Sequence, residues 1–510
     1  APGPRDGEVG PALYLQGRRA DGTPLAARRS GGMVVTGEQA ACVSCHRRSG
    51  LGSTEGLSHI PPVSGEALLR MQPPGKGPSA TGNGRPAYTP ATLLRALHEG
   101  VDPAGRELDW LMPRYELADA EVRGLLRYLD TLPRARVRPD EAGPLHFATV
   151  FTPGVPARSR QAMLEVLQAC FDEHNAVRAP ERGRRKLAAD MSLRRPRAWE
   201  LHAWDLQGPQ GTWDAQLAAH AQAQLVSALV GGVGAGTWAP VHGYCERTGL
   251  PCLFPHLDQP VDSPVAFSAL YLSKGVTLEA GLIAQQLARS LSKGRVVQRV
   301  LGSDGAARSA AQALGEMLDA QHLAHETWVL LDNAALPAKR LAQLSADDSI
   351  VLWLRPGLLA TLGAEPAPAA RVFLSGTLAT RDDVPLAPGW KARAFMAYPF
   401  ELPQVRSAST ERLRDWIRGK GLVPQEERIQ ADAHLACSAL RSGMQDSESH
   451  PAPDYLLEKI ESNIERWPLL ALYPRPSLGP GQRFASKTGY VVRFDADSGQ
   501  LLPVGERSSP

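Results

Sequence analysis

The sequence lacks any continuous apolar run of about eighteen residues, the length needed to cross a lipid bilayer. It also has little net charge: 56 Lys and Arg against 53 Asp and Glu give +3, and the basic residues form no long block. These absences argue against a membrane-spanning protein and against a nucleic-acid-binding protein. We find no Ser-His-Asp order, HExxH motif, P-loop or supported pair of catalytic carboxylates. The sequence therefore predicts a protein that is not an enzyme.

Cysteine is scarce as well, with six in 510 residues, but two of them stand in the run Cys42-Val43-Ser44-Cys45-His46. Two thiols at this spacing reach the two vinyl groups of one porphyrin, while the following imidazole turns onto the iron. A zinc knuckle is the competing interpretation, but it needs a second Cys or His pair at a suitable distance, and none follows. The motif predicts one covalently attached haem c, held by Cys42, Cys45 and His46.

The length of the chain suggests about two to four domains. Residues 132–144 combine three Pro with charges and little apolar content, which is typical of a boundary. We therefore predict a first domain over 1–138, a linker over 139–144 and a second domain over 145–510.

The first domain has a recognisable order of segments: a helix over 10–17, the haem motif, a helix over 92–99, a Met-Pro turn at Met112 and a final helix over 118–132. The final helix has apolar residues at helical spacing. This order resembles the class I cytochrome c domain over its whole length. The resemblance implies an all-α fold.

The same resemblance implies the axial ligands of the iron. His46 matches the proximal ligand, and Met112 matches the distal methionine that precedes a proline. A backbone carbonyl near Pro61 or Pro62 is expected to orient the proximal ring. A thioether ligand raises the reduction potential, and two filled axial positions leave no place for a substrate, so the domain is predicted to transfer electrons. Other candidates for the distal ligand are Met33, Met71, His59 and His98.

The second domain alternates strand and helix patterns from a strand over 146–151 to a helix over 455–464. Between them the patterns include a helix over 213–224, an apolar strand over 225–232 and a strand over 371–375. Such alternation predicts parallel sheets covered by helices on both faces, and its length predicts two lobes. Three segments, 267–272, 473–483 and 489–494, together with Glu279-Ala280, resemble the substrate-binding proteins of ABC transporters. The relevant branch is the type I periplasmic binding protein fold of the branched-chain amino acid receptor kind. The resemblance implies a two-lobed α/β fold over about 145–500.

The glycine-rich loop 231–237 follows an apolar strand and precedes a helix, where exposed amides suit a carboxylate. By resemblance to amino-acid receptors, Ala235, Gly236 and Thr237 are the positions expected to hold the carboxylate of a small ligand. Glycines that serve only a tight turn are the alternative. Thr152 lies in another loop at a strand end, the edge where open parallel sheets bind ligands.

An α-amino group on such a ligand would need a carboxylate partner. Asp258, Asp304 and Asp332 are the well-placed acids. None of them matches a family motif, so a cleft that has lost its ligand remains an alternative. The predicted ligand is a small carboxylate or an amino acid.

The four other cysteines bear on the compartment. Residues 1–5 carry no initiator Met and no apolar signal core, and look like a mature N-terminus left after export. In the oxidising periplasm, Cys245 and Cys252 are expected to form a short-loop disulfide. Cys170 and Cys437 fit a pair of buried thiols as well as a bond.

These expectations combine into a periplasmic monohaem cytochrome that exchanges electrons with a redox partner: a cytochrome, a quinoprotein dehydrogenase or an oxidase. Its receptor-like domain would dock partners or sense a ligand. Two alternatives remain open. One is the solute-binding protein of an ABC transporter that carries a redox-sensing haem. The other is the electron-transfer subunit of a periplasmic dehydrogenase.

Overall fold

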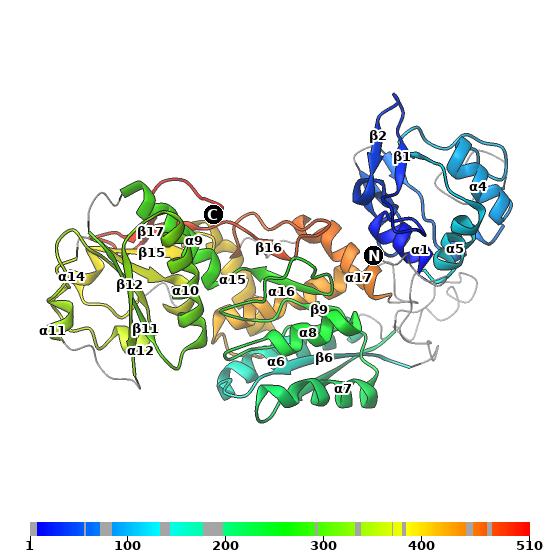
Figure 1. The fold of residues 1–510 in the computed structure, drawn as a ribbon. Coiled ribbons are helices and arrows are strands. Elements are labelled where there is room, and N and C mark those ends of the chain that lie inside the picture. Colours follow the sequence, from blue (N-terminus) through cyan, green and yellow to red (C-terminus); the bar gives the residue numbers. More distant parts are fainter. Residues whose placement is uncertain are drawn as a thin grey trace. The chain divides into compact units, whose positions relative to one another are not determined.

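The chain divides into two units in the computed structural model (Figure 1). The first comprises Ala1–Pro139 and Asp446–Lys459, and the second Asp140–Gln445 and Ile460–Pro510. The structure describes residues 8–55, 58–71, 84–132, 143–176, 197–290, 294–331, 338–369, 371–379, 384–444, 452–466 and 472–510.

Helices form most of the core of the first unit. They are α1 (Val9–Pro11), continued by a π-helical turn over Ala12–Gln16, α2 (Val43–His46), α3 (Gly65–Leu68), α4 (Pro90–Glu99) and α5 (Asp119–Asp130). Helix α4 begins at a capping box formed by Thr89 and Thr92, which satisfies backbone donors of its first turn. Helices α1 and α5 meet at two glycines. A Cβ atom on Gly10 would come within 2.5 Å of the Gly124 carbonyl oxygen.

The first unit also contains short strands, so the expectation of an all-α domain is not met. Strands β1 (Ala26–Arg28), β2 (Val34–Thr36) and β5 (Arg114–Tyr115) form an antiparallel sheet in the order β2-β1-β5. Strands β3 (Ser53–Glu55) and β4 (Ser58–Ile60) form a hairpin. Each of these strands has two or three residues. Such strands are too short to show the period-2 alternation by which strands are predicted.

The described strands of the first lobe of the second unit form a six-stranded parallel sheet in the order β16-β10-β9-β8-β6-β7. The strands are β6 (Leu145–Phe151), β7 (Trp199–Asp205), β8 (Leu229–Val230), β9 (Cys252–Leu253), β10 (Ala269–Ser273) and β16 (Phe484–Ser486). Strand β8 is shorter than the predicted apolar run over 225–232. Leu225 has a φ of 47° and ends helix α7 (Trp213–Gln224).

Helices cover both faces of this sheet. Ala148 and Val150 of β6 pack in one cluster with residues of α7 (Trp213–Gln224) and α8 (Ala239–Thr248). Phe147, on the opposite face, contacts Phe171 of α6 (Ala157–Ala176). Helix α16 (Glu427–Met444) lies beside α6 and also contacts β8 and β9.

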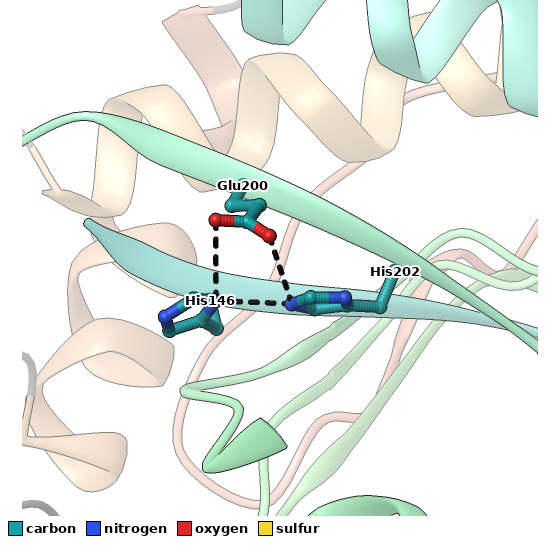
Figure 2. A group of neighbouring side chains, drawn as sticks. All are labelled: His146, Glu200 and His202. Carbon is teal, nitrogen blue, oxygen red and sulfur yellow. Dashed lines mark hydrogen bonds and ion pairs between the residues drawn. The ribbon is translucent and has the colours of Figure 1, made fainter. Parts of the chain in front are cut away.

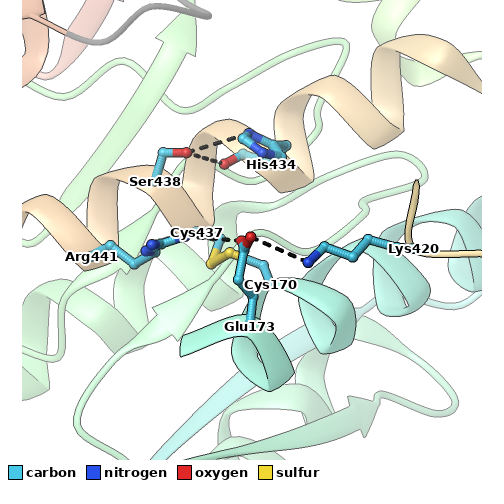
Figure 3. Close-up of a disulfide and its surroundings, with 7 residues drawn as sticks. All are labelled: Cys170, Glu173, Lys420, His434, Cys437, Ser438 and Arg441. Atoms are coloured by element: carbon cyan, nitrogen blue, oxygen red, sulfur yellow. Dashed lines mark hydrogen bonds and ion pairs between the residues drawn. A yellow bond between two sulfur atoms is a disulfide. The ribbon is translucent and has the colours of Figure 1, made fainter. Parts of the chain in front are cut away.

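A disulfide between Cys170 and Cys437 joins α6 to α16 (Figure 3). Glu173, one turn beyond Cys170, accepts ion pairs from Lys420 at 3.2 Å and from Arg441 at 3.1 Å. The sequence did not decide between two buried thiols and a disulfide for this pair, and the structure shows the disulfide. Cys245 and Cys252 are also paired, as predicted.

The second lobe contains a seven-stranded sheet in the order β12-β11-β13-β14-β15-β17-β18. Its strands are β11 (Val296–Leu301), β12 (His325–Leu330), β13 (Ser349–Trp353), β14 (Arg371–Ser375), β15 (Ala394–Tyr398), β17 (Tyr490–Phe494) and β18 (Leu501–Pro503). The pairs β15–β17 and β17–β18 are antiparallel. The remaining pairs in this sheet are parallel.

Successive residues of β13 point to opposite faces of the second sheet. Val351 and Trp353 pack with residues of α9 (Val276–Ser290) and α10 (Gly305–Ala320), which lie side by side (Figure 1). Ile350 and Leu352 pack into the cluster on the other face. That face is covered by the short helices α11 (Ala338–Leu341), α12 (Pro356–Leu359) and α14 (Pro388–Lys391).

The chain passes between the lobes three times. It leaves the first lobe after β10, returns through α15 (Pro403–Gly419) and α16, and crosses again between β16 and β17. Helix α17 (Pro453–Asn463) precedes β16. The predicted two-lobed α/β fold is confirmed. Among the described residues, no helix has the length and hydrophobicity that a membrane span requires.

Candidate functional site

The haem motif forms a single helical turn in the first unit. Helix α2 is preceded by Cys42 at its N-cap, and neither Cys42 nor Cys45 takes part in a disulfide. Two buried tyrosines hold the ends of this segment. The Tyr115 hydroxyl donates to the Ala40 carbonyl at 3.0 Å, and the Tyr14 hydroxyl donates to the Arg47 carbonyl at 2.6 Å. The two thiols and the imidazole are therefore presented from one fixed turn.

The His46 ring is oriented by a backbone carbonyl. Its Nδ1 lies 3.0 Å from the Pro61 carbonyl oxygen, and the side chain is only 6% exposed. Burial lowers the pKa of His46, which favours the neutral imidazole. Nδ1–H then donates to Pro61, and the lone pair of Nε2 is left to bind a metal. The sequence left Pro61 and Pro62 as candidates for this carbonyl, and Pro61 supplies it.

Gly52 allows the segment that contains Pro61 to approach the motif. It has a φ of 74°, and a Cβ atom at this position would lie 2.1 Å from the Ile60 carbonyl oxygen. No other residue fits both the backbone conformation and the space.

Met112 is half-buried and packs against the core cluster that Cys42 and Val43 also contact. The Arg114 guanidinium donates a hydrogen bond to its carbonyl oxygen. The competing methionines are on the surface, with Met33 57% and Met71 77% exposed.

The histidine alternatives are also weaker candidates. His98 Nε2 accepts the Leu117 backbone N–H at 3.1 Å, so this ring has a structural partner. The side chain of His59 lies outside the described residues. Position in the fold therefore favours Met112 over Met33, Met71 and His98.

Sequence analysis missed Glu458, which belongs to the first unit. Its carboxylate accepts the backbone N–H groups of Arg48 at 2.7 Å and Ser49 at 3.1 Å, together with the Ser49 hydroxyl. Burial raises the pKa of Glu458 to about 7. These bonds fix the loop that directly follows His46. A separation of 409 residues left no local signal for this contact.

The second unit has a pocket at the carboxyl ends of strands from both lobes. The lining residues come from the ends of β9, β10, β14 and β15, from α16 and from the segment before β16: Pro255, His256, Leu257, Pro260, Leu272, Ser273, Gly275, Thr377, Pro399, Phe400, Arg428, Asp432 and Tyr473. This is the edge at which open α/β sheets bind ligands. In this conformation the pocket leaves about 20 Å³ in which the centre of a water molecule can lie, room for one or two waters.

Charged groups converge in this pocket. Asp432 pairs with His256 Nδ1 at 2.6 Å and accepts the Tyr473 hydroxyl at 2.7 Å. Burial and the Asp432 charge raise the pKa of Tyr473, so it stays a neutral donor. Arg428 donates to the Thr377 carbonyl at 3.0 Å and lies 4.2 Å from the centre of the Phe400 ring. Within the part of the chain that is described, Arg428 Nε has no hydrogen-bond partner.

The residues predicted to bind a carboxylate are Ala235, Gly236 and Thr237, with Thr152 in a neighbouring loop. They lie together but do not line this pocket. The Thr152 hydroxyl accepts the Ala235 N–H at 2.8 Å. Gly236 is exposed, has a φ of 79° and has open space where a Cβ atom would point. Thr237 accepts the N–H of Ala239, the first residue of α8, at 3.2 Å. The loop that the sequence predicted to hold a carboxylate therefore lies outside this pocket.

Two of the three acids proposed for an α-amino group already have a partner. The Arg355 guanidinium donates to Asp258 and to Asp304, each at 2.7 Å. Asp304 also caps α10 by accepting the Ala307 N–H at 3.2 Å. The two carboxylates raise the pKa of Arg355. Arg355 of the second lobe thus forms an ion pair with Asp258 of the first lobe and another with Asp304 of its own lobe. Asp332 lies outside the described residues.

Comparison with known proteins gives a fold but no family. The chain matches no protein family model and no curated protein. Among solved structures it is similar to a branched-chain amino acid ABC transporter protein of Thermus thermophilus with bound valine. The identity is 11%, the match covers 72% of this chain and 97% of that one, and the TM-score is 0.52.

Two further structures give the same result. A substrate-binding periplasmic protein of Ralstonia solanacearum is 14% identical, with 71% of this chain and 100% of that one covered and a TM-score of 0.50. A branched-chain amino acid ABC transporter periplasmic ligand-binding protein of Burkholderia xenovorans is 13% identical, with 72% and 96% covered and a TM-score of 0.50. Only the second unit is long enough to account for a match that covers 71% or 72% of this chain. The second unit therefore has the two-lobed fold of type I periplasmic binding proteins.

Proposed function

We propose that the protein is a periplasmic solute-binding protein whose first unit carries one covalently attached haem c. The observation that carries the haem assignment is the buried His46 ring, held by Pro61 in the tautomer that leaves Nε2 available. Thioether attachment in bacteria takes place outside the cytoplasm. The disulfides Cys170–Cys437 and Cys245–Cys252 suit the same oxidising compartment.

The residues of the first unit fit a haem. Cys42 and Cys45 would form the thioether bonds, and His46 and Met112 would bind the iron. When bound, the haem supplies one-electron redox chemistry. Pro61 orients His46, and Glu458 holds the loop that follows it. Tyr14 and Tyr115 keep the turn in place from the core side.

The assignment of Met112 is tested by Met112→Ala with Met71→Ala as the matched control. In the oxidised protein, Met112→Ala should remove the weak far-red absorption of a methionine–Fe(III) bond and lower the midpoint potential, because a neutral soft ligand is lost. Met71, which is 77% exposed, should be replaceable without either change. An unaltered spectrum in Met112→Ala would move the ligand to another residue.

The pocket of the second unit supports a small carboxylate or amino acid as the solute. Arg428 offers a guanidinium nitrogen without a partner in the described structure, and Asp432 with His256 offers a counter-charge for an amino group. The lobes would have to separate to admit such a solute. Hinge motion of this kind is common in two-lobed binding proteins.

A thermal-shift screen of amino acids and small carboxylates, read from tryptophan fluorescence, tests this ligand. A solute at a hundred times its Kd should stabilise the second unit by about 2.7 kcal/mol. Arg428→Met should abolish the shift. Arg414→Met should keep it, because Arg414 pairs with Glu411 and Glu427 on the surface. A screen without any shift would contradict the solute-binding proposal.

A second candidate is an electron-transfer protein in which the receptor fold serves only to dock a cytochrome, a quinoprotein dehydrogenase or an oxidase. The small free volume of the pocket and the Arg355 ion pair favour it. The two candidates differ in whether the haem senses the solute, which only the first candidate allows. If it does, a saturating solute must change the midpoint potential of the haem. Reduction of the haem must then change the Kd of the solute by the same free energy. Potentials that are identical with and without a bound solute would exclude redox sensing.

A further inference from the structure

Two histidines and a glutamate converge at the edge of the first sheet of the second unit. His146 is on β6, and Glu200 and His202 are on the neighbouring strand β7 (Figure 2). The parallel register pairs His146 with Glu200 and Ala148 with His202. Residues two apart on a strand share a face, so all three side chains project from the same side of the sheet.

The potential ligand atoms are close enough to share one ion. His146 Nδ1 lies 3.0 Å from His202 Nε2, and the two Glu200 oxygens lie 3.7 Å and 3.9 Å from these nitrogens. Tetrahedral zinc with bonds of about 2.0–2.1 Å places its ligand atoms about 3.3 Å from one another. The three observed distances lie around this value, so small rotations of the side chains would bring the ligand atoms to one ion.

The exposure of the three side chains also suits a metal site. The His202 side chain is 17% exposed and that of His146 is 32% exposed, whereas that of Glu200 is 52% exposed. The site is thus walled on one side and open to solvent on the other, where a water could complete the coordination.

The surroundings separate this cluster from the solute pocket. His146 and Glu200 are each the second residue of their strands, so the cluster lies near the amino ends. The pocket lies at the carboxyl ends of the strands. Strand β7 is the last strand of the described sheet and pairs with β6 alone. An ion held by both strands would pin this edge without obstructing the cleft.

We propose that His146, Glu200 and His202 form a binding site for one divalent ion of the zinc class, at the edge strand of the first lobe. Two imidazoles and a carboxylate suit Zn²⁺, with Cu²⁺ and Ni²⁺ as competitors, and do not suit the hard ions Mg²⁺ and Ca²⁺. None of the three residues belongs to the haem motif or lines the pocket of the second unit.

Equilibrium dialysis of the metal-stripped full-length protein against Zn²⁺, with elemental analysis of both compartments, tests the site without interference from haem absorption. We expect one equivalent of zinc per chain that Mg²⁺ does not displace. His146→Gln and His202→Gln should each weaken zinc binding by at least about 100-fold, since removing a direct ligand exceeds the 10–100-fold cost of losing an outer-shell partner.

Two further variants make the result decisive. His325→Gln is the matched control, because His325 pairs with Asp319 at 3.0 Å but belongs to no group of three potential metal ligands among the described residues. It should keep its zinc. Glu200→Gln changes an exposed side chain, so this variant should fold and should bind zinc more weakly. It keeps the test valid if a histidine variant does not fold. Zinc binding that is absent, unchanged in all three cluster variants, or equally reduced in His325→Gln would overturn the proposal.

Discussion

The two units of this chain place their polar groups in different ways. In the first unit, one helical turn presents two thiols and an imidazole, and nearby tyrosines and one proline carbonyl fix it in place. In the second unit, the polar groups of the pocket come from the ends of four strands and from a helix that returns from the other lobe. The chemistry of a contiguous motif can be predicted from the sequence. For a pocket built from separate elements, the sequence predicts only the fold that contains it.

The largest difference between the units should appear when the haem motif is removed. In the double variant Cys42→Ser, Cys45→Ser, no haem should remain in the denatured protein, because both thioether bonds are lost. The unfolding of the second unit should be unchanged, and tryptophan fluorescence reports it because nine of the ten Trp lie in that unit. Mass spectrometry of the denatured chain measures the first effect. Haem mass retained in the variant would contradict the attachment site.

The disulfides should show how far the second unit depends on long-range links. Cys437→Ser breaks a bond between residues 267 apart, and Cys252→Ser breaks one between residues 7 apart. Loop-closure entropy predicts losses of about 6 and about 2 kcal/mol in the free energy of unfolding. Denaturant titration followed by fluorescence measures both. Equal losses would show that the link between α6 and α16 contributes no more than a local staple.

A matched pair of buried glutamates should give the two units separate pH responses. Burial raises the pKa of Glu458 in the first unit and that of Glu279 in the second to about 7, from 4.5. The folded state then binds more protons than the unfolded state between about pH 4.5 and 7. The free energy of unfolding therefore falls as pH rises through this window, by about 3 kcal/mol for each group.

Replacement of each glutamate by glutamine tests this assignment. Glu458→Gln should flatten the pH dependence of the first unit, read from haem absorption. Glu279 accepts hydrogen bonds from the Ser375 hydroxyl and the Thr377 N–H. Glu279→Gln should flatten the pH dependence of the second unit, read from tryptophan fluorescence. Each variant is the control for the other. A variant that flattens both curves, or neither, would contradict the assignment.

The smallest expected effect concerns the ion pair between the lobes. Arg355→Gln should cost the second unit about 1 kcal/mol, because Arg355 is partly exposed. It should also release Asp258 and Asp304, and so increase any thermal shift caused by amino acids. Arg295→Gln is the control, since Arg295 pairs with Glu326 and Asp348 inside one lobe. An equal ligand effect in both variants would show that the interlobe pair does not compete with a ligand.

Several elements were predictable because their signals are local. The helix over Trp213–Gln224 and the strand over Arg371–Ser375 were predicted with the boundaries observed. Apolar spacing gives such elements directly. The short strands β1 to β5 were not predictable, because two or three residues carry no periodicity. The loop of Ala235 and Gly236 was found from its glycines. Arg428 and Asp432 were missed because they lie on a helix with no motif around them.

The sequence alone determined the spacing of Cys42, Cys45 and His46 and the strand–helix alternation that indicates two α/β lobes. Both are properties of neighbouring residues. Only the tertiary structure decided that Cys437 meets Cys170 and that Glu458 meets Ser49. It also decided that His146 meets His202 across two strands. These contacts depend on strand order, register and the three passages between lobes. Those features result from the packing of the whole chain, which no single segment encodes.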